Sequence, residues 1–531
     1  MPEARSWQVR EWLSHRLSRG LHELDRARGR GLRALDRARD RIRRQWRRTP
    51  PEQRRTWQLV AVSAGTGLAV AVVAVLVAGP WDAGQRTAER ARATEDGVPG
   101  GGRDDGPARP APSAAPVLAA LGGPAAPRSP DSGEDAVPPP TGAGLADTLE
   151  PLLEDSALGD ERSVSVVDVT TGQQVFGSKA GTAMVPASTI KLATGAAALS
   201  ALGPDHRIRT SVVAGAGEND IVLVGGGDPT LTAREVTGDD HPAALVQLAD
   251  ATARALKKRG AGPYRLGYDT SLYSGSKLHP IGPNENISPV VPLMADEGRK
   301  DDSDHGPAPR ATDPAADAAG TFASMLRDRG VEVTGEPRSG KAAKGARTLA
   351  SVRSQPLSSL VERMLTTSDN DIAEALSRQT ALAAGEPASF AGGAKAVTER
   401  LRKLGLPLDG ARIADGSGLD RADHVSAGLL AQVLVRAAAQ DHPELRSLLT
   451  GLPVAGFTGT LRTRYADGVG RGVVRAKTGT LTGVNSLAGS VVDADGRLLV
   501  FAYLTNGTTD PNGAQHALDR MASALANCGC R

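Results

Sequence analysis

The chain has 531 residues, among them 62 Gly, 35 Pro and two Cys, and a formal net charge of +3. This length allows roughly three to four domains with a sizeable core. The two cysteines, Cys528 and Cys530, are too few for a disulfide scaffold or a Cys-based zinc site, and the basic excess lies within residues 1–56, so it does not indicate a nucleic-acid-binding protein.

The first predicted element is a basic amphipathic helix within residues 1–56, which hold 17 Arg and 7 acidic residues. Leu-Asp-Arg-Ala-Arg occurs at 24–28 and again at 35–39, and an offset of 11 residues, three helical turns, puts both copies on one face. Binding to anionic lipid at the inner leaflet, binding to nucleic acid, and a solvated segment that only sets membrane topology all stay open for this segment.

Residues 57–79 form an uncharged run of 23 residues that is rich in Val, Ala and Leu. At about 1.5 Å per residue a helix of this length spans a hydrocarbon core of ~30 Å, and Trp57 and Trp81 bracket it as an interfacial aromatic belt does. Its length disfavours a buried soluble helix, and the 56 residues before it disfavour a cleaved signal peptide. We therefore predict a single-pass helix in the cell membrane, with the N-terminus in the cytoplasm and everything after Trp81 outside.

The next segment, residues 80–142, is predicted to be a disordered linker. It contains 12 Pro and 10 Gly in 63 residues and few large apolar side chains. Such a composition cannot bury enough surface to offset the conformational entropy of the chain. Ordered structure should begin near Leu145, where the pattern changes to alternating strands and amphipathic helices.

The first candidate motif opens a helix that is predicted over residues 186–202. Ser188 and Lys191 are three residues apart, so their side chains share one helix face. This arrangement suits a serine nucleophile at the positive end of a helix with a lysine base beside it. Alone the motif is weak, because a Ser-x-x-Lys occurs about once by chance in a chain of this length, and a second copy, Ser274 to Lys277, falls in a predicted loop.

The second candidate motif is Ser368-Asp369-Asn370, a short polar break between helices predicted at 357–365 and 372–380. Such a break can project the Ser and Asn side chains into a cleft. All three residue types are also common helix caps, so the motif taken alone favours the cap.

The third candidate motif, Lys477-Thr478-Gly479-Thr480, follows a strand predicted at 472–476. Gly479 allows a close approach of the backbone to a ligand, and the Lys and Thr side chains suit a carboxylate. A surface turn is the alternative interpretation. Two further strands are predicted to form a hairpin downstream, at 486–492 and 498–505.

Together and in this order, the three motifs are typical of penicillin-binding proteins and active-site serine β-lactamases. The 180 residues between Ser188 and Ser368 exceed the spacing in compact β-lactamases and leave room for an insertion at about 205–345. With this insertion the chain resembles the D-Ala-D-Ala carboxypeptidase/endopeptidase family, the low-molecular-mass class C penicillin-binding proteins, over about residues 145–527. Five further stretches carry the resemblance: 225–231, 268–275, 293–299, 415–419 and 452–456.

The resemblance implies an α+β fold for residues 143–531. It would comprise a β-lactamase/transpeptidase-like domain, with an antiparallel sheet flanked by helices, and an accessory domain inserted at about 205–345. The insertion is shorter than in the longest members of the family, which implies that one of their accessory domains is trimmed.

The resemblance also implies a mechanism. Ser188 would attack the carbonyl of the penultimate D-Ala of a peptidoglycan stem peptide, with Lys191 as base, and water would hydrolyse the acyl-enzyme. Partial burial and the nearby Lys477 charge should lower the pKa of Lys191. Ser368 would relay a proton to the leaving amine, and Asn370 would hold the substrate amide and orient Lys191.

The same resemblance assigns the substrate-binding residues. Lys477, Thr478 and Thr480 would bind the terminal carboxylate beside Gly479, and the backbone N–H groups of Ser188 and Thr480 would form the oxyanion hole. β-Lactam antibiotics carry a matching carboxylate and would acylate Ser188. No metal, organic cofactor or nucleic acid takes part in this scheme.

We therefore predict a serine-type D-Ala-D-Ala carboxypeptidase, with DD-endopeptidase activity left open. A β-lactam sensor or penicillin-trapping receptor would need a cytoplasmic effector, for which 56 residues are too few. A β-lactamase is disfavoured by the predicted anchor and insertion. A purely structural cell-wall-binding protein would tolerate loss of Lys191 or Lys477, yet all the motif residues are present, which disfavours this class as well. For Cys528 and Cys530, a local disulfide, a free pair and an intermolecular bridge all stay open.

Overall fold

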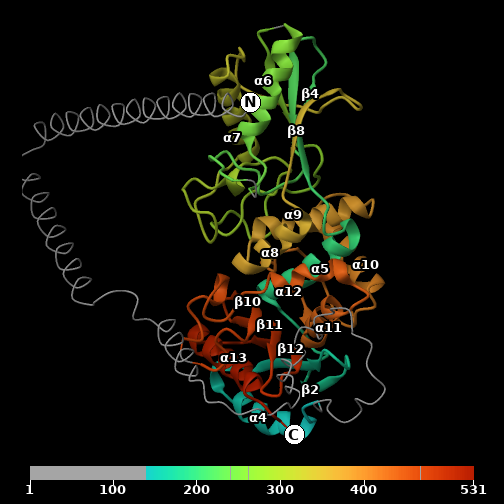
Figure 1. Cartoon of the computed structure of the whole chain (residues 1–531), viewed down its shortest axis with the longest axis vertical. Helices are drawn as coiled ribbons and strands as arrows, with labels where there is room; N and C mark the ends of the chain where they lie inside the picture. Colours follow the sequence, from blue (N-terminus) through green and yellow to red (C-terminus); the bar gives the residue numbers. More distant parts are fainter. Residues whose placement is uncertain (1–138, 239–240, 261, 467, 531) are drawn as a thin grey trace, which may run out of the picture. The chain divides into compact units, whose positions relative to one another are not determined.

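The computed structural model describes residues 139–531 except 239–240, 261, 467 and 531. The predictions for 1–56, for 57–79 and for residues 80–138 of the linker concern residues outside this part of the chain. The predicted end of the linker at 142 is wrong, because a helix begins at Gly142 and is capped by the Thr141 side chain. Within it, no helix is both long enough and apolar enough to cross a membrane. The described residues belong to one compact unit, drawn in colour in Figure 1.

The main sheet has five antiparallel strands in the order β10-β11-β12-β1-β2. The strands are β1 (Glu161–Asp168), β2 (Gln174–Ser178), β10 (Arg475–Leu481), β11 (Val484–Val492) and β12 (Leu498–Asn506). The predicted hairpin is confirmed as β11 and β12. The strand predicted at 472–476 is wrong at its start, because Gly472 has a φ of 76° in a turn and pairing begins at Arg475.

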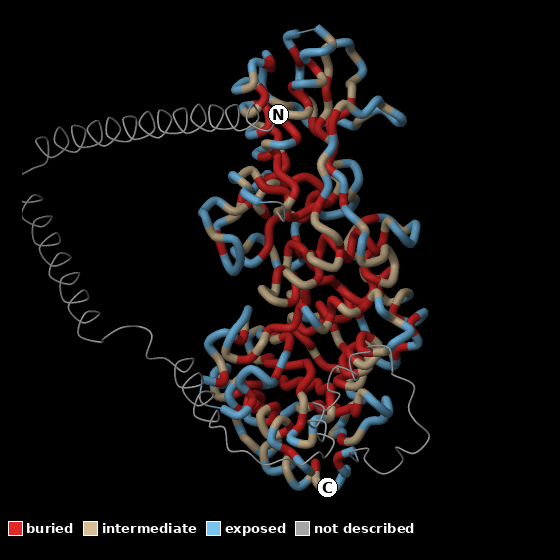
Figure 2. Tube along the Cα trace, in the orientation of Figure 1, coloured by how far each residue is buried: buried red, intermediate tan, exposed pale blue. Residues whose placement is uncertain are grey.

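Both faces of β11 and β12 are buried, and β12 is accordingly an unbroken hydrophobic run from Leu498 to Leu504. Along β12 the odd-numbered side chains from Leu499 to Tyr503 belong to a core shared with α4 (Gly142–Leu153) and α13 (Pro511–Ala526). The even-numbered side chains from Val500 to Leu504 belong to a second core on the opposite face, as the alternation of side chains along a strand requires. Figure 2 shows these strands mostly as buried.

The second face of the main sheet is covered by helices that share one hydrophobic core. They are α5 (Lys191–Leu202), α8 (Leu357–Thr367), α9 (Asn370–Ala383), α10 (Phe390–Lys403), α11 (Ala427–Ala438) and α12 (Ser447–Thr450). The three helices predicted beside the first two motifs are present as α5, α8 and α9. The first of them begins as a 3-10 turn, η3 (Ala187–Ile190).

Residues 209–353, which we call the inserted segment, form a second sheet with its own core. The order is β7-β6-β5-β4-β8, with β5, β6 and β7 parallel and the other pairs antiparallel. Its elements are β4 (Arg209–Ala214), β5 (Asp220–Val224), α6 (Leu245–Arg259), β6 (Arg265–Asp269), α7 (Pro314–Asp328), β7 (Arg338–Ser339) and β8 (Thr348–Arg353). Helices α6 and α7 share the core of this sheet (Figure 1). The insertion predicted at about 205–345 overlaps this segment.

Short elements connect these layers. They are η2 (Ser156–Leu158), η4 (Asp296–Gly298), η5 (Pro443–Leu445), η6 (Gly459–Leu461) and the two-stranded pair β3 (Ala183–Met184) and β9 (Val425–Ser426). Cys528 and Cys530 form a local disulfide after α13, which answers the question that the sequence left open. The Cys530 carbonyl accepts a hydrogen bond of 2.7 Å from the Thr141 N–H just before α4.

Candidate active site

The Ser188 turn lies at the N-terminal end of α5. Ser188 is in η3 and Lys191 is the first residue of α5, so their side chains lie one turn apart. Ala187 has a φ of 48°, a left-handed conformation that is uncommon for a residue with a side chain. The turn packs against Gly418, where an added Cβ would lie 2.1 Å from the Ala187 carbonyl oxygen. Close backbone packing therefore holds Ser188 in a strained turn, as is frequent at functional sites.

The amine of Lys191 is fully buried and has three oxygen neighbours. Its Nζ lies 2.9 Å from Ser188 Oγ, 2.7 Å from Asn370 Oδ1 and 2.6 Å from the backbone carbonyl oxygen of Ser417. Burial lowers the pKa of Lys191 to about 8, although nearby carboxylates oppose the shift. The amine can therefore lose its proton near neutral pH while it contacts Ser188.

The Ser368-Asp369-Asn370 motif joins α8 to α9 and combines the two roles that its sequence allowed. Asp369 caps α9, since its side chain accepts a hydrogen bond from the Ile372 N–H at 3.0 Å. Ser368 has a φ of 61°, which ends α8. Asn370 is the first residue of α9, and its Oδ1 contacts the lysine amine. The motif is thus a helix cap whose two flanking residues face the site.

Lys477 lies on β10 and is as buried as Lys191. Its Nζ donates to Ser368 Oγ at 2.8 Å and to the Thr478 carbonyl at 2.7 Å. Burial, followed by the charge of Lys191, lowers the pKa of Lys477 well below its ordinary value. The sequence analysis predicted that burial and the Lys477 charge both lower the pKa of Lys191. Burial does lower it, but the leading charged neighbours of Lys191 are carboxylates, which raise its pKa.

Gly479 is required for a reason other than the predicted approach to a ligand. An added Cβ would lie 2.1 Å from Ser486 Oγ and 2.7 Å from the Pro186 carbonyl oxygen. Ser486 Oγ donates to the same carbonyl at 2.7 Å. The glycine therefore lets β10 pack directly against the turn that carries Ser188.

A cavity of about 400 Å³ brings most of the predicted residues together. The predicted residues that line it are Ser188, Ser368, Asn370, Thr478 and Thr480. Lys191, Lys477 and Gly479 are not part of its wall. The inserted segment contributes Asn286, Arg299, Gly306, Pro307 and Arg310.

The inserted segment also holds the residues around Asn370. Asn370 Nδ2 donates to the Asn286 carbonyl at 2.9 Å, which turns its Oδ1 toward the lysine amine. The Ser288 N–H donates to Asp371 Oδ1 at 2.9 Å, and Arg310 Nη1 lies 3.0 Å from Asp371 Oδ2. The first turn of α9 is therefore fixed by a part of the chain that precedes it by more than sixty residues.

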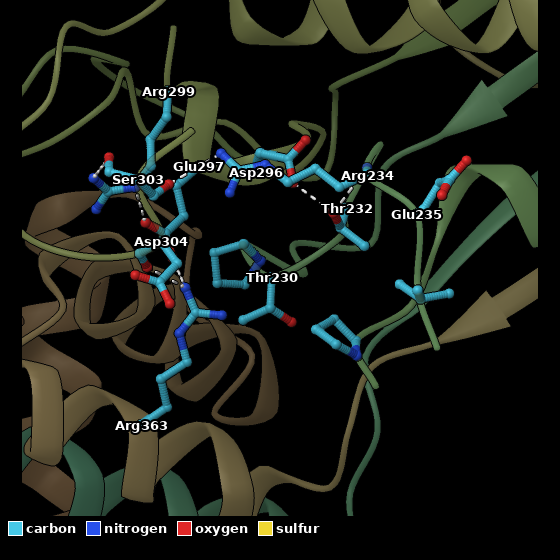
Figure 3. A pocket seen from close by; sticks show the side chains of 13 residues that line it. Thr230, Thr232, Arg234, Glu235, Asp296, Glu297, Arg299, Ser303, Asp304 and Arg363 are labelled. Carbon is cyan, nitrogen blue, oxygen red and sulfur yellow. Dashed lines mark hydrogen bonds and ion pairs between the residues drawn. The ribbon is translucent and has the colours of Figure 1, made fainter. Parts of the chain in front are cut away.

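A second cavity, of about 300 Å³, lies where the inserted segment meets α8 (Figure 3). Glu297 is buried there and accepts hydrogen bonds from Arg299, at 2.9 Å, and from Arg363 of α8. Arg363 Nη2 also lies 3.7 Å from Asp369 Oδ2. Burial, together with the neighbouring carboxylates of Asp369 and Asp371, raises the pKa of Glu297, so its ionised form depends on the arginines. This cavity is a charged junction whose arginines already bind protein groups.

Two buried groups of side chains have the composition of a metal site. They are His279, Glu374 and Asp415, and Glu297, Asp369 and Asp371, each with ligand atoms within 4.8 Å of one another. In the first group His279 Nε2 and Asp415 Oδ2 share a hydrogen bond of 2.8 Å. In the second, arginines supply the positive charge. Both groups are therefore satisfied by hydrogen bonds and ion pairs within the protein.

Several contributors to the site were missed by the sequence analysis. Ser417 acts through a backbone carbonyl, and Asn286 does so as well, so residue type carries no signal for either. Thr460 Oγ1 lies 2.8 Å from Thr478 Oγ1, and no motif marks it. The 415–419 stretch that carried part of the resemblance was the only available pointer to Ser417. Ser274 of the alternative Ser-x-x-Lys lies in an exposed loop and does not line the site.

The fold and the site define an α+β, transpeptidase-like serine hydrolase. Residues 145–305 and 300–528 match the D-Ala-D-Ala carboxypeptidase 3 (S13) family, and the chain belongs to that family. It is therefore a serine-type D-Ala-D-Ala carboxypeptidase/endopeptidase of the penicillin-binding type. The predicted family, enzyme class and transpeptidase-like fold are confirmed.

Relatives of known name agree with this assignment. A carboxypeptidase of Mycobacterium tuberculosis is 37% identical over 408 residues, which cover 75% of this chain and 86% of that protein. A D-alanyl-D-alanine carboxypeptidase of Actinomadura is 30% identical over 449 residues, which cover 69% of this chain and 82% of that protein. The crystal structure of penicillin-binding protein 4 (DacB) from Haemophilus influenzae superposes with a TM-score of 0.59 and 25% identity, over 72% of this chain and 98% of that one.

Proposed function

We propose that Ser188 attacks the D-Ala-D-Ala peptide bond with Lys191 as its base. The observation that carries this proposal is the distance of 2.9 Å between Ser188 Oγ and a buried lysine amine. An ammonium group has three donors and no free lone pair. After loss of one proton, the two remaining hydrogens can serve the Asn370 and Ser417 oxygens while the lone pair faces Ser188. The amine then accepts the serine proton as the Oγ–carbon bond forms.

The proton must next reach the leaving amine of the terminal D-Ala. We assign this relay to Ser368, because this residue lines the cavity and its Oγ accepts a hydrogen bond of 2.8 Å from Lys477 Nζ. Asn370 gives one amide hydrogen to the Asn286 carbonyl and keeps a second for a substrate carbonyl. Release of D-Ala leaves an acyl-enzyme at Ser188, which water hydrolyses.

The strand side of the cavity would bind the terminal carboxylate. Thr478 and Thr480 line the cavity with hydroxyl groups, and Lys477 lies directly behind them on the same strand. An incoming carboxylate favours the charged form of Lys477, because an opposite charge raises a lysine pKa. The backbone N–H groups of Ser188 and Thr480 are assigned to the oxyanion hole, with Gly479 allowing β10 to reach the Ser188 turn.

The substrate class and the location are part of the same proposal. Peptidoglycan stem peptides supply the D-Ala-D-Ala bond, and β-lactams would acylate Ser188 as covalent inhibitors. We assign residues 57–79 to a single-pass membrane anchor, the residues between this anchor and α4 to a linker, and the inserted segment to an accessory domain. With this organisation we expect the site to lie outside the cell membrane, on the same side as peptidoglycan.

Covalent labelling with a fluorescent penicillin tests the nucleophile. Ser188→Ala should abolish labelling, whereas Ser274→Ala, in the other Ser-x-x-Lys, should leave it intact. Circular dichroism of both variants checks that they are folded. Labelling that persists in Ser188→Ala would contradict the proposal.

Product analysis tests the reaction. The chain is incubated with a D-Ala-D-Ala pentapeptide and, separately, with a cross-linked muropeptide, and the products are separated by mass spectrometry. Release of D-Ala supports carboxypeptidase activity, and cleavage of the cross-link supports endopeptidase activity. A stable acyl-enzyme with neither product would indicate a sensor instead.

A further inference from the structure

The loop at 415–419 contributes a backbone atom to the site. The Ser417 carbonyl oxygen is the nearest of the three acceptors around the Lys191 amine, at 2.6 Å. Ser188 Oγ lies 3.4 Å from the same oxygen. A base that is held by three partners keeps its direction only if each partner is itself fixed. The direction of the Lys191 amine therefore depends on the groups that hold the Ser417 carbonyl in place.

Two buried carboxyl groups hold this loop from behind. Glu374 Oε1 accepts from the N–H groups of Gly416 and Ser417, both at 2.9 Å. Asp415 Oδ1 accepts from the N–H groups of Ser417, at 3.0 Å, and Gly418, at 2.6 Å. Glu374 and Asp415 are each about 1% exposed. Asp415 thus fixes the Ser417–Gly418 peptide plane, which contains the Ser417 carbonyl, and Glu374 fixes the two peptide planes before it.

Helix α9 links this loop to the second motif. Asn370 and Glu374 are four residues apart, so they lie on one face of α9. Asn370 contacts the Lys191 amine with its side chain, and Glu374 binds the N–H of Ser417, the residue whose carbonyl contacts the same amine. One helix face thus positions two of the three acceptors.

Two more buried residues enclose Asp415. His279, from the inserted segment, lies with Nε2 2.8 Å from Asp415 Oδ2, and both side chains are almost fully buried. Asp423 accepts from the Ala414 N–H at 2.6 Å on the other side. Burial, followed by the charge of Asp415, raises the pKa of Asp423 to about 10, so this carboxyl stays protonated. Hydrogen bonds, first of all the one from His279, outweigh burial and keep the pKa of Asp415 low.

We propose that Glu374 and Asp415 are positioning residues that fix the Ser417 carbonyl against Lys191 and control the protonation of that lysine. The proposal rests on the function proposed above, in which Lys191 is the base. It assigns a role in catalysis to two carboxyl groups that do not line the cavity.

The two carboxyl groups act on Lys191 by charge as well as by geometry. Both stabilise its ammonium form and so oppose the effect of burial on its pKa. Glu374 is itself raised to a pKa of about 7 by burial and by the charge of Asp415, so it is ionised when Lys191 loses its proton near pH 8. The charged or titratable groups that face Lys191, Glu374 and Asp415 are Asp369, Asp423, His279, Asp420, Lys477 and the buried Arg378 of α9.

The pH dependence of acylation by a fluorescent penicillin tests the proposal. Glu374→Gln keeps the acceptor oxygen and removes the charge. Without that charge the ammonium form of Lys191 is less stable, so the acid limb of the rate profile should move down by about one pH unit. Between about pH 7 and pH 8, where Glu374 is ionised in the wild-type protein, the rate relative to its plateau should then rise several-fold. Asp415→Asn removes the other charge and should move the limb in the same direction.

Two further variants separate charge from geometry. Glu374→Asp keeps the charge but shortens the side chain by one methylene, so the plateau rate should fall while the limb stays in place. Glu399→Gln, on the exposed face of α10, is the matched control and should change neither quantity. Thermal unfolding of each variant reports its stability independently.

The outcomes are distinct. The proposal would be overturned if the acid limb of the acylation profile stays at the wild-type pH in both Glu374→Gln and Asp415→Asn, whatever happens to the plateau rate. The two carboxyl groups would then have a purely structural role. A wild-type profile without an acid limb, or labelling that survives Lys191→Met, would instead contradict Lys191 as the base. A downward shift in the charge-removing variants with an unmoved limb in Glu374→Asp supports the proposal.

Discussion

The two sides of the cavity each carry one fully buried lysine, in opposite electrostatic surroundings. On the helical side, Lys191 contacts three oxygen atoms and has carboxylates as its leading charged neighbours. On the strand side, Lys477 contacts Ser368 and a backbone carbonyl, and its leading charged neighbour is another cation, Lys191. Burial lowers both pKa values, but only Lys191 has nearby negative charge that keeps its pKa near 8.

This difference matches two chemical tasks. A general base works best when its pKa lies near the operating pH, because it must be neutral often and still accept a proton. A group that binds an anion gains its charge from the ligand itself and needs no carboxylate beside it. We therefore expect the helical side to control the rate of acylation and the strand side to control recognition and alignment. The following experiments test this division.

Lys191→Met should have the largest effect. It removes the base and leaves an apolar side chain of similar length, so penicillin acylation should fall by about 10³-fold. The fold should survive, because replacing a buried charge by an apolar group removes a desolvation cost. Stopped-flow labelling and thermal unfolding measure the two effects, with Lys395→Met on the exposed surface as the control. Labelling within a few-fold of wild type would rule out Lys191 as the base.

Gly479→Ala should break the strand side. The new Cβ would overlap Ser486 Oγ and the Pro186 carbonyl, so β10 should move away from the Ser188 turn. We expect about a 10²-fold loss of acylation, since small misplacements in an active site have effects of this size. Gly340→Ala is the matched control, because an added Cβ meets no atom within 4 Å there. Adding Ser486→Gly should restore part of the activity; no recovery would mean that the Ser486 contact is not the cause.

The wild-type pH profile shows which lysine limits the reaction. The neutral form of Lys191 increases as the pH rises through about 8, so acylation should increase about tenfold between pH 7 and pH 9. The folded pKa lies below the ordinary value of 10.5, so the folded state binds fewer protons than the unfolded state between these values. The unfolding free energy should therefore rise with pH from about 8 to 10.5. An acylation rate that is flat from pH 6 to pH 9 would contradict this assignment.

Arg310→Met tests the contribution of the inserted segment and should have the smallest effect on rate. It leaves the buried Asp371 carboxylate without its ion pair, which should destabilise the fold by about 3 kcal/mol. Acylation should fall only several-fold, because Asn370 keeps its bonds to Lys191 and to the Asn286 carbonyl. Chemical denaturation and labelling measure both effects, with the exposed Arg402→Met as the control. An unchanged unfolding free energy would mean that the ion pair does not stabilise the first turn of α9.

Local sequence signals predicted the elements that carry the motifs. Local patterns of apolar residues indicated α8, α9 and the β11–β12 hairpin. Only α8 has one regular apolar face, whereas α9 and the two strands are buried almost throughout. The start of β10 was wrong, since Gly472 and its neighbours have strand-like composition but form a turn. The approach of residues 286–310 to α9 had no local signal at all, because it depends on backbone carbonyls and on ion pairs between distant segments.

By itself, the sequence determined the family, the reaction class and the identity of the three motifs, because nucleophile, base and carboxylate-binding groups need particular side chains at particular spacings. Only the tertiary structure decided how these side chains are placed and what surrounds them. It brought Lys191 to the Ser417 carbonyl, moved Lys477 behind the cavity wall and made Gly479 a packing position between two backbone segments. The physical reason is that burial, hydrogen-bond direction and the charges around a lysine are set by residues far away in the chain, and no local pattern encodes them.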